Sequence, residues 1–135
     1  MVNPRKSWPV DPALIPLHDR TGRANTGHAL ETAVLVELER RRAAVTWVKT
    51  PGGGEVDFLA RFPDGREALI QVCADASAPE TAEREIAALL SAATRHPRAE
   101  LHLLTLTGRE VSVPISDSIR TAPAWRWLLD DGMGD

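Results

Sequence analysis

The sequence predicts an α/β domain: a mixed β-sheet with helices on both faces, in the order helix, three strands, helix, strand. The chain has 135 residues, a length that suits one domain. Three strand-like segments follow one another across short turns that contain glycine, which favours antiparallel neighbours. A further strand is reached through a helix, and a helical crossover normally places its two strands parallel.

Residues 1–24 are expected to form an extended segment that leads from an upstream domain, if the chain has one. Three prolines between positions 9 and 16 prevent a helix or a central strand there. Asn25 or Thr26 is predicted to cap a helix over about 27–42. The folded domain is therefore expected to span 25–135.

The next segments alternate between strands and turns. Residues 43–50, 55–62 and 67–73 are rich in the β-branched, aromatic and apolar residues typical of strands. The glycine run at 52–54 closes the first hairpin, and the Pro-Asp-Gly turn at 63–65 closes the second. These three strands should form one antiparallel unit.

The second half of the chain is expected to supply a helix over 77–96, an apolar strand over 99–107 and, within 109–131, a short strand and a last helical turn. The side chains predicted to pack inward are Ile86, Leu89, Leu90 and Ala93 in the helix, and Trp125, Leu128 and Leu129 in the tail.

The overall charge gives no general attraction to nucleic acid or to an anionic membrane, because the formal net charge is -3 and the pI is about 5.8. A single cysteine, Cys73, excludes an internal disulfide. The sequence has no Walker A motif, and its four histidines lack ligand-like spacing. No segment resembles a transmembrane helix or a signal peptide, so a cytoplasmic protein without membrane partners is expected.

Two carboxylates occupy unusual positions. Glu31 falls inside the apolar arc that Leu30, Val34 and Leu38 form on the first helix. Asp57 interrupts a hydrophobic strand. A buried carboxylate needs a hydrogen-bond partner, a cation or a proton, so each position requires an explanation.

Strand alternation predicts that Asp57 meets Gln71 and Cys73 across the second hairpin. The first helix is expected to cover this face and to point Glu31 at it. Taken singly, the carboxylates can be ordinary charges satisfied by nearby arginines, and Gln71 and Cys73 can be core residues. Their convergence from three consecutive elements favours a site or its remnant.

These residues and their order resemble the restriction-endonuclease-like PD-(D/E)XK fold. More narrowly, the segments "KSWPVDPALI", "GHALETAVLVELERRR", "EVDFLA", "LIQVC" and "ETAEREIAALL" are similar to a domain of unknown function that forms the C-terminal part of many prokaryotic AAA+ ATPases. The resemblance covers nearly the whole chain. Its individual motifs are short, but their order and spacing are more specific.

The nuclease pattern implies three acidic residues that hold a divalent metal, with a lysine that supports the attacking water. Glu31 and Asp57 match the first two acids. Gln71 stands where the third acid belongs, and it can offer only a neutral carbonyl to the metal. Cys73 stands where the lysine belongs, and Lys49, across the first hairpin, is a candidate replacement.

The resemblance therefore implies an accessory domain of an AAA+ ATPase family protein with a degenerate nuclease site. Such a domain would bind DNA, an ATPase module or a second copy of itself, and the ATPase motor would lie upstream or have been lost. No cofactor is firmly expected, although Mg²⁺ would be required if the site were active. The alternatives are an active Mg²⁺-dependent DNA endonuclease and a purely protein-binding module.

Overall fold

The computed structural model describes residues 22–108 and 111–130, and the α/β class and the mixed sheet are confirmed. Its elements are α1 (Gly22–Arg40), β1 (Ala44–Lys49), β2 (Glu55–Arg61), β3 (Glu67–Val72), α2 (Pro79–Ala93), β4 (Glu100–Thr105), β5 (Ile119–Pro123) and α3 (Ala124–Leu129).

The start of α1 differs from the prediction. The helix already includes Gly22, so the expected cap at Asn25 or Thr26 is wrong, because both residues lie inside the helix. The expected boundary between residues 24 and 25 also falls within α1. Most of the predicted extended segment, residues 1–21, lies outside the described residues.

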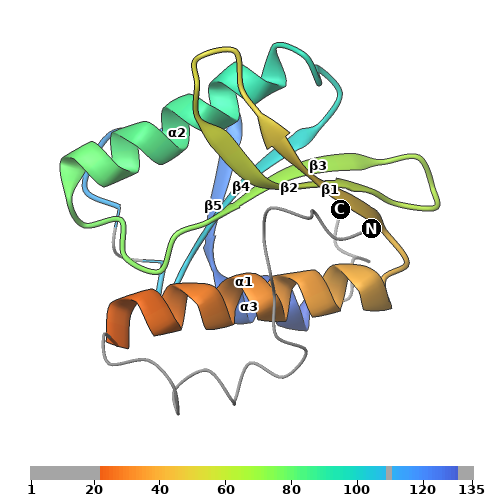
Figure 1. The fold of residues 1–135 in the computed structure, drawn as a ribbon, viewed down its shortest axis with the longest axis horizontal. Helices are drawn as coiled ribbons and strands as arrows, with labels where there is room; N and C mark the ends of the chain where they lie inside the picture. The colour runs from red at the N-terminus through yellow and green to blue at the C-terminus, as the bar shows by residue number, and fades with distance from the viewer. Residues whose placement is uncertain (1–21, 109–110, 131–135) are drawn as a thin grey trace.

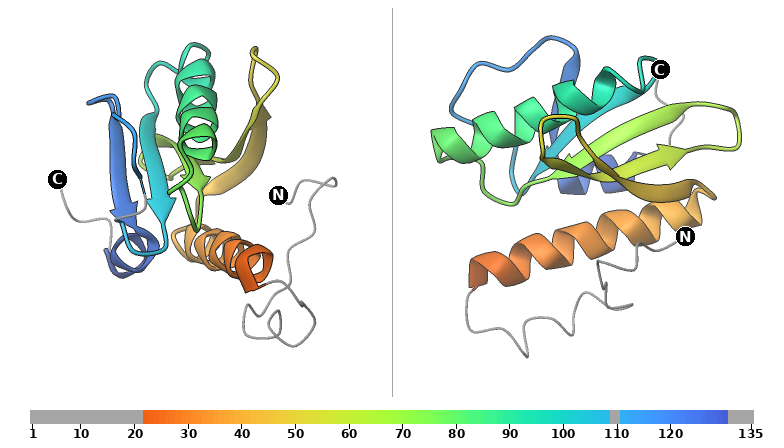
Figure 2. Two further views of the ribbon diagram at one scale, coloured as in Figure 1. Left: turned by 90° about the vertical axis from the view of Figure 1, so that its left-hand side faces the viewer. Right: turned by 45° about the horizontal axis from the view of Figure 1, so that its top comes forward.

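The five strands form one sheet in the order β1-β2-β3-β4-β5. β1, β2 and β3 are antiparallel neighbours, whereas β4 is parallel to β3 and β5 is parallel to β4. α2 lies on one face of the sheet, and α1 and α3 lie side by side on the other (Figures 1 and 2). Among the described residues, no helix combines the length and the apolar character that crossing a bilayer requires.

The sheet separates two hydrophobic cores. The core on the α1 and α3 face contains Val34, Leu35, Leu38, Val45, Phe58, Ala60, Ala68, Ile70, Leu104, Ala124 and Trp127. The core on the α2 face contains Val56, Leu59, Leu69, Ile86, Ala88, Leu89, Ala92, Leu101, Leu103 and Ile119.

The prediction that the first helix covers the face of Leu59 and Leu69 is wrong. α1 packs on the opposite face, against Phe58 and Ile70, and α2 covers Leu59 and Leu69. The reason is the connection between β3 and β4, which are parallel. A crossover between parallel strands is almost always right-handed, and this places α2 on one particular face and leaves the other to α1.

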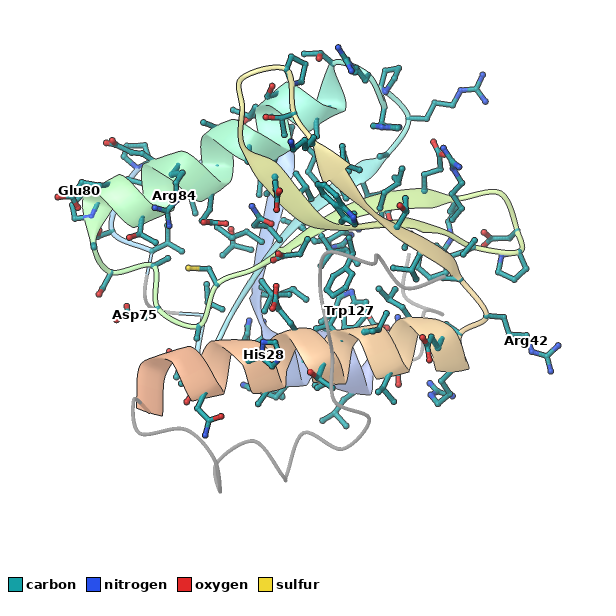
Figure 3. The ribbon with its side chains drawn as sticks, viewed as in Figure 1. His28, Arg42, Asp75, Glu80, Arg84 and Trp127 are labelled. Carbon is teal, nitrogen blue, oxygen red and sulfur yellow. The ribbon has the colours of Figure 1, made fainter. Side chains whose placement is uncertain are left out.

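The end of α1 is built around Arg42, which has a positive φ of 62°. The Ala43 N–H donates to the Leu38 carbonyl at 3.0 Å, and the Arg42 N–H donates to the Glu39 carbonyl at 2.9 Å. This is a Schellman motif with arginine at the position where glycine is most common. It turns the chain into β1, and the Arg42 side chain projects into solvent beyond the helix (Figure 3).

Arg41, at the end of α1, binds α3 through hydrogen bonds and a ring contact. Its Nη2 donates to the Trp127 carbonyl at 3.0 Å and to the Asp130 carbonyl, and its guanidinium lies 4.6 Å from the centre of the Trp127 ring. Arg41 therefore has a structural role, because it joins α3 to the end of α1.

The inward face of α3 was mispredicted. Trp127 is buried, whereas Trp125 is 53% exposed and Leu129 is 78% exposed. In so short a helix only residues three or four apart share a face, so burial of Ala124 and Trp127 turns Trp125 and Leu129 outward. Leu128 packs against the core as expected, but Leu90 of α2 is exposed.

The stability of α1 should depend on pH through Glu37. The Glu37 carboxylate accepts hydrogen bonds from Arg40 at 2.6 and 2.9 Å and from Arg41 at 2.6 Å. The bond from Arg40, aided by that from Arg41, lowers the pKa of Glu37 to about 2. Because the folded-state pKa lies below the unfolded value, this stabilisation is present above about pH 4.5 and is lost as the pH falls toward 2.

We expect Glu37→Gln to lower the free energy of unfolding at pH 7 by about 1–2 kcal/mol, a value reduced for solvent screening. The difference from the wild type should shrink between pH 5 and pH 3 in urea denaturation. Glu39→Gln, at an exposed position on the same helix, is the control and should change little. A difference that stays constant over this pH range would mean that the Glu37 charge has no net effect.

Candidate functional site

The strands β2 and β3 are joined by side chains where their regular pairing ends. The backbone register runs from Arg61 opposite Glu67 to Phe58 opposite Ile70. Beyond it, the Asp57 N–H donates to Gln71 Oε1 at 2.8 Å. We call the hydrogen-bonded group formed by these two residues the Asp57–Gln71 junction.

Gln71 uses both ends of its amide in this junction. Its Nε2 donates to the Glu55 carbonyl at 3.0 Å, while its Oε1 accepts from the Asp57 N–H. The side chain is only 2% exposed, and a buried amide must be satisfied within the protein. The opposite demands of a carbonyl and an N–H also fix which end of the amide faces which group. Gln71 thus replaces the missing backbone pairing.

Asp57 completes the junction from the other strand. The Val72 N–H donates to Asp57 Oδ2 at 2.9 Å, so the carboxylate binds the backbone of β3 while the Gln71 amide binds the backbone of β2. The two side chains therefore cross the gap in opposite directions. The structure thus brings Asp57 and Gln71 together, but not through regular alternation, because Val56 and Leu59 pack in the same core.

Cys73 lies just beyond β3 and is half-buried. Its backbone N–H donates to the Leu104 carbonyl at 2.8 Å, and its Sγ lies 3.3 Å from the Asp75 carbonyl oxygen. Burial, reinforced by repulsion from the Glu85 carboxylate, raises the pKa of the thiol to about 11. At neutral pH this group is an uncharged thiol, which cannot supply the positive charge of a lysine.

Glu85 of α2 is a candidate residue that the sequence analysis missed. Its side chain is only 17% exposed, it lies 3.4 Å from Arg84, and its charge acts on Cys73. The sequence carried a signal for it: Glu85 is three residues after Ala82 and four before Leu89, both buried. The criterion that selected Glu31, a carboxylate within an apolar helical arc, also selects Glu85.

The two remaining candidates come from α1 and β1. Glu31 is half-buried, and its carboxylate lies 3.9 Å from Nδ1 of His28, one turn earlier on α1. Figure 3 shows His28 on α1 below the sheet. Lys49 is exposed at the end of β1, opposite Glu55. It therefore lies two positions along the paired strand from Asp57.

These residues do not fit a Mg²⁺ site. Mg²⁺ prefers several oxygen ligands in octahedral geometry, commonly carboxylates. In the described part of the chain, no three His, Cys, Asp or Glu side chains are grouped so that they could hold a metal ion. The Gln71 carbonyl oxygen already accepts the Asp57 N–H, and Asp57 Oδ2 already accepts the Val72 N–H. What the junction does in the structure is to hold β2 and β3 together.

A second polar group lies on strands β4 and β5. Glu100 Oε2 is 3.7 Å from His102 Nε2, and Glu100 Oε1 is 3.4 Å from Arg120 Nη1. Burial lowers the pKa of His102, which favours the neutral imidazole at pH 7. This group is an ion pair beside a partly buried histidine and has no catalytic arrangement of its own.

Comparison with known proteins finds no family model, no curated protein and no solved structure that matches this chain. Inference about function therefore rests on the geometry of the junction and of the exposed surface.

Proposed function

We propose that the chain is a restriction-endonuclease-like domain that has no cleavage activity and serves as a protein-binding module, with an AAA+ ATPase as the expected partner. The observation that carries this proposal is the Asp57–Gln71 junction. The two positions where the nuclease pattern requires ligands instead hold β2 and β3 together through 2.8–3.0 Å hydrogen bonds.

Charge supports the loss of cleavage activity. Phosphodiester hydrolysis by this route needs a metal that neutralises the developing charge and a cation near the attacking water. Gln71 provides a neutral amide instead of a carboxylate, and Cys73 provides a neutral thiol instead of an ammonium group. Lys49, the candidate replacement, is exposed at a strand end.

The exposed surface favours a protein partner over DNA. α3 presents Trp125 and Leu129 to solvent, and the Arg126 guanidinium lies 5.4 Å from the centre of the Trp125 ring. Tryptophan and arginine are the residue types that most often dominate protein interfaces. Several arginines that could attract phosphates are paired with acids, as Arg61 is with Glu67 and Arg66 is with Asp64.

DNA binding is the second candidate, because an exposed tryptophan beside an arginine can also stack on an unpaired base. Binding of this kind would weaken steeply with salt, since it depends on phosphate contacts. Fluorescence anisotropy with labelled single-stranded and duplex DNA at low and physiological salt distinguishes the two. We expect little DNA binding at physiological salt, and salt-sensitive binding that Trp125→Ala weakens would favour the second candidate.

We further expect the purified domain to leave supercoiled and linear DNA intact in millimolar Mg²⁺ or Mn²⁺. Agarose gel analysis over several hours measures this directly, and Asp57→Ala protein prepared in the same way controls for contaminating nucleases. Cleavage by the wild type that disappears in Asp57→Ala would overturn the proposal and establish the active endonuclease instead.

A further inference from the structure

A hollow of about 140 Å³ lies between the β1–β2 loop and α2. Thr50, Gly52 and Gly54 line it from the loop. Arg84, Ala87, Ala88 and Ser91 line it from the helix, where their spacing places them on one face. This hollow is separate from the Asp57–Gln71 junction, and none of its lining residues has a role in the proposed nuclease remnant.

The hollow exists because its walls lack side-chain bulk. A Cβ at Gly54 would lie 3.5 Å from the Ala88 Cβ, and a Cβ at Gly52 would lie 3.8 Å from Ser91 Oγ. The loop is held in place by three hydrogen bonds. The Thr50 N–H donates to the Gly54 carbonyl at 2.8 Å, the Gly53 N–H donates to the Thr50 carbonyl at 3.0 Å, and the Gly54 N–H donates to Thr50 Oγ1 at 3.1 Å. The hollow is therefore preformed, which lowers the entropic cost of binding.

The lining defines the chemistry of a ligand. Glycine backbone and the methyl groups of Ala87 and Ala88 suit an apolar group, whereas Arg84 brings a positive charge. Arg84 is 71% exposed, and its contact with Glu85 is long at 3.4 Å, so the guanidinium can turn toward an incoming anion. Figure 3 shows Arg84 projecting from α2. A phosphate is a poorer fit, because it needs several donors and would face alanine methyl groups.

The volume of the hollow limits the size of the group that it can bind. A volume of 140 Å³ corresponds to about five water molecules, and hence to a group of about five non-hydrogen atoms. The side chain of glutamate has two methylenes and a carboxylate and meets both requirements. So small a group binds weakly by itself, so the hollow suits an anchoring residue of a larger partner.

We infer that this hollow receives the side chain of a glutamate from a partner protein, with its methylenes against Gly54 and Ala88 and its carboxylate paired with Arg84. The inference rests on the proposed protein-binding function, because it names the chemistry of the partner. It also assigns a role to the glycine run of the β1–β2 loop, which is longer than a tight hairpin requires.

The test uses blocked pentapeptides with a central glutamate or glutamine between alanines, titrated into the ¹⁵N-labelled domain. We expect the glutamate peptide to shift the amide resonances of Gly52, Gly54, Ala87 and Ala88. The glutamine peptide should bind about two- to fivefold more weakly, the range expected for one exposed ion pair. Equal binding of the glutamate and glutamine peptides, or shifts confined to other residues, would overturn the inference.

Two variants locate the binding within the hollow. Ala87→Leu fills the hollow from an exposed helical position and should abolish the shifts, whereas Arg84→Gln should remove the preference for glutamate over glutamine. Arg98→Gln, an exposed arginine outside the hollow, is the matched control and should bind like the wild type. Melting temperatures confirm that each variant folds. Binding that survives Ala87→Leu would overturn the inference.

The outcome is separable from that of the proposed function. A domain that cleaves DNA but still selects the glutamate peptide through Arg84 would disprove the noncatalytic proposal and leave the hollow assigned. If the domain cleaves no DNA and does not prefer the glutamate peptide, the proposed function stands and the assignment of the hollow is overturned. An oligonucleotide that shifts the same four amides more strongly than the peptide would assign the hollow to phosphate instead and overturn the inference.

Discussion

Trp127→Ala is expected to lower the free energy of unfolding by about 3–5 kcal/mol, the range for removal of a large buried aromatic side chain. Trp127 lies between α1 and the sheet, and only 9% of it is exposed (Figure 3). Its loss would also remove the ring over which Arg41 stacks at 4.6 Å. Because α3 has a single turn and a half, its docking depends on this side chain more than on its own helical stability.

Urea denaturation measures the effect. The slope of the free energy of unfolding against urea concentration should not change if the native state remains compact. Trp125→Ala is the matched control, because it removes the same side chain from the same helix at a position that is 53% exposed. It should change the free energy of unfolding by no more than about 0.5 kcal/mol. Equal losses in the two variants would contradict the orientation of α3.

Hydrophobic periodicity predicted the long elements well. The arc on α1 led correctly to burial of Val34 and Leu38, because a helix of five turns repeats its apolar positions several times. α3 has only six residues, so two opposite faces, one with Trp127 and one with Trp125, fit its sequence equally well. Its burial depends on tertiary packing, including the hydrogen bonds from Arg41.

Periodicity also cannot tell which face of a sheet a helix will cover. The apolar arc of α1 fits either face, so the sequence did not distinguish a helix above Leu59 from one above Phe58. The handedness of the β3–α2–β4 crossover makes that choice, and this is a property of the whole topology. The expected approach of Glu31 to the Leu59 face failed for this reason.

The junction residues were identifiable, but their role was not. Asp57 and Gln71 are recognisable as polar residues in apolar strands, and hydrogen bonds between side chain and backbone bring them together in the structure. Their partners, however, are backbone groups of Glu55, Asp57 and Val72 at a place where the strands leave their regular register. A sequence pattern does not reveal where the backbone pairing of two strands ends. It therefore cannot distinguish polar side chains that bind a metal from polar side chains that take the place of missing backbone hydrogen bonds.

Gln71→Leu is expected to cost about 2–4 kcal/mol. The change preserves approximate size but leaves the Asp57 N–H and the Glu55 carbonyl without the side-chain partners they have now. Each buried backbone group that loses its partner costs about 1–3 kcal/mol. Urea denaturation again gives the value, and the loss should vary little with pH because neither glutamine nor leucine titrates. A loss below about 0.5 kcal/mol would show that the junction does not hold the strands together.

Gln71→Glu tests the same position with a group that titrates. An introduced carboxylate can still accept from the Asp57 N–H, but its second oxygen would face the Glu55 carbonyl, beside Asp57 and almost without solvent. Burial and repulsion should raise its folded-state pKa, so the variant loses stability as the pH rises above about 4.3, the value in an unfolded chain. Near pH 4 the protonated acid can donate to the Glu55 carbonyl, and the variant should approach wild-type stability.

Denaturation of the Gln71→Glu variant at pH 4 and pH 8, without divalent ions, tests this expectation. Its free energy of unfolding should be slightly below that of the wild type at pH 4 and far below it at pH 8. Equal stability of the variant and the wild type at pH 8 would mean that a positive charge already compensates at the junction, contrary to its structural role.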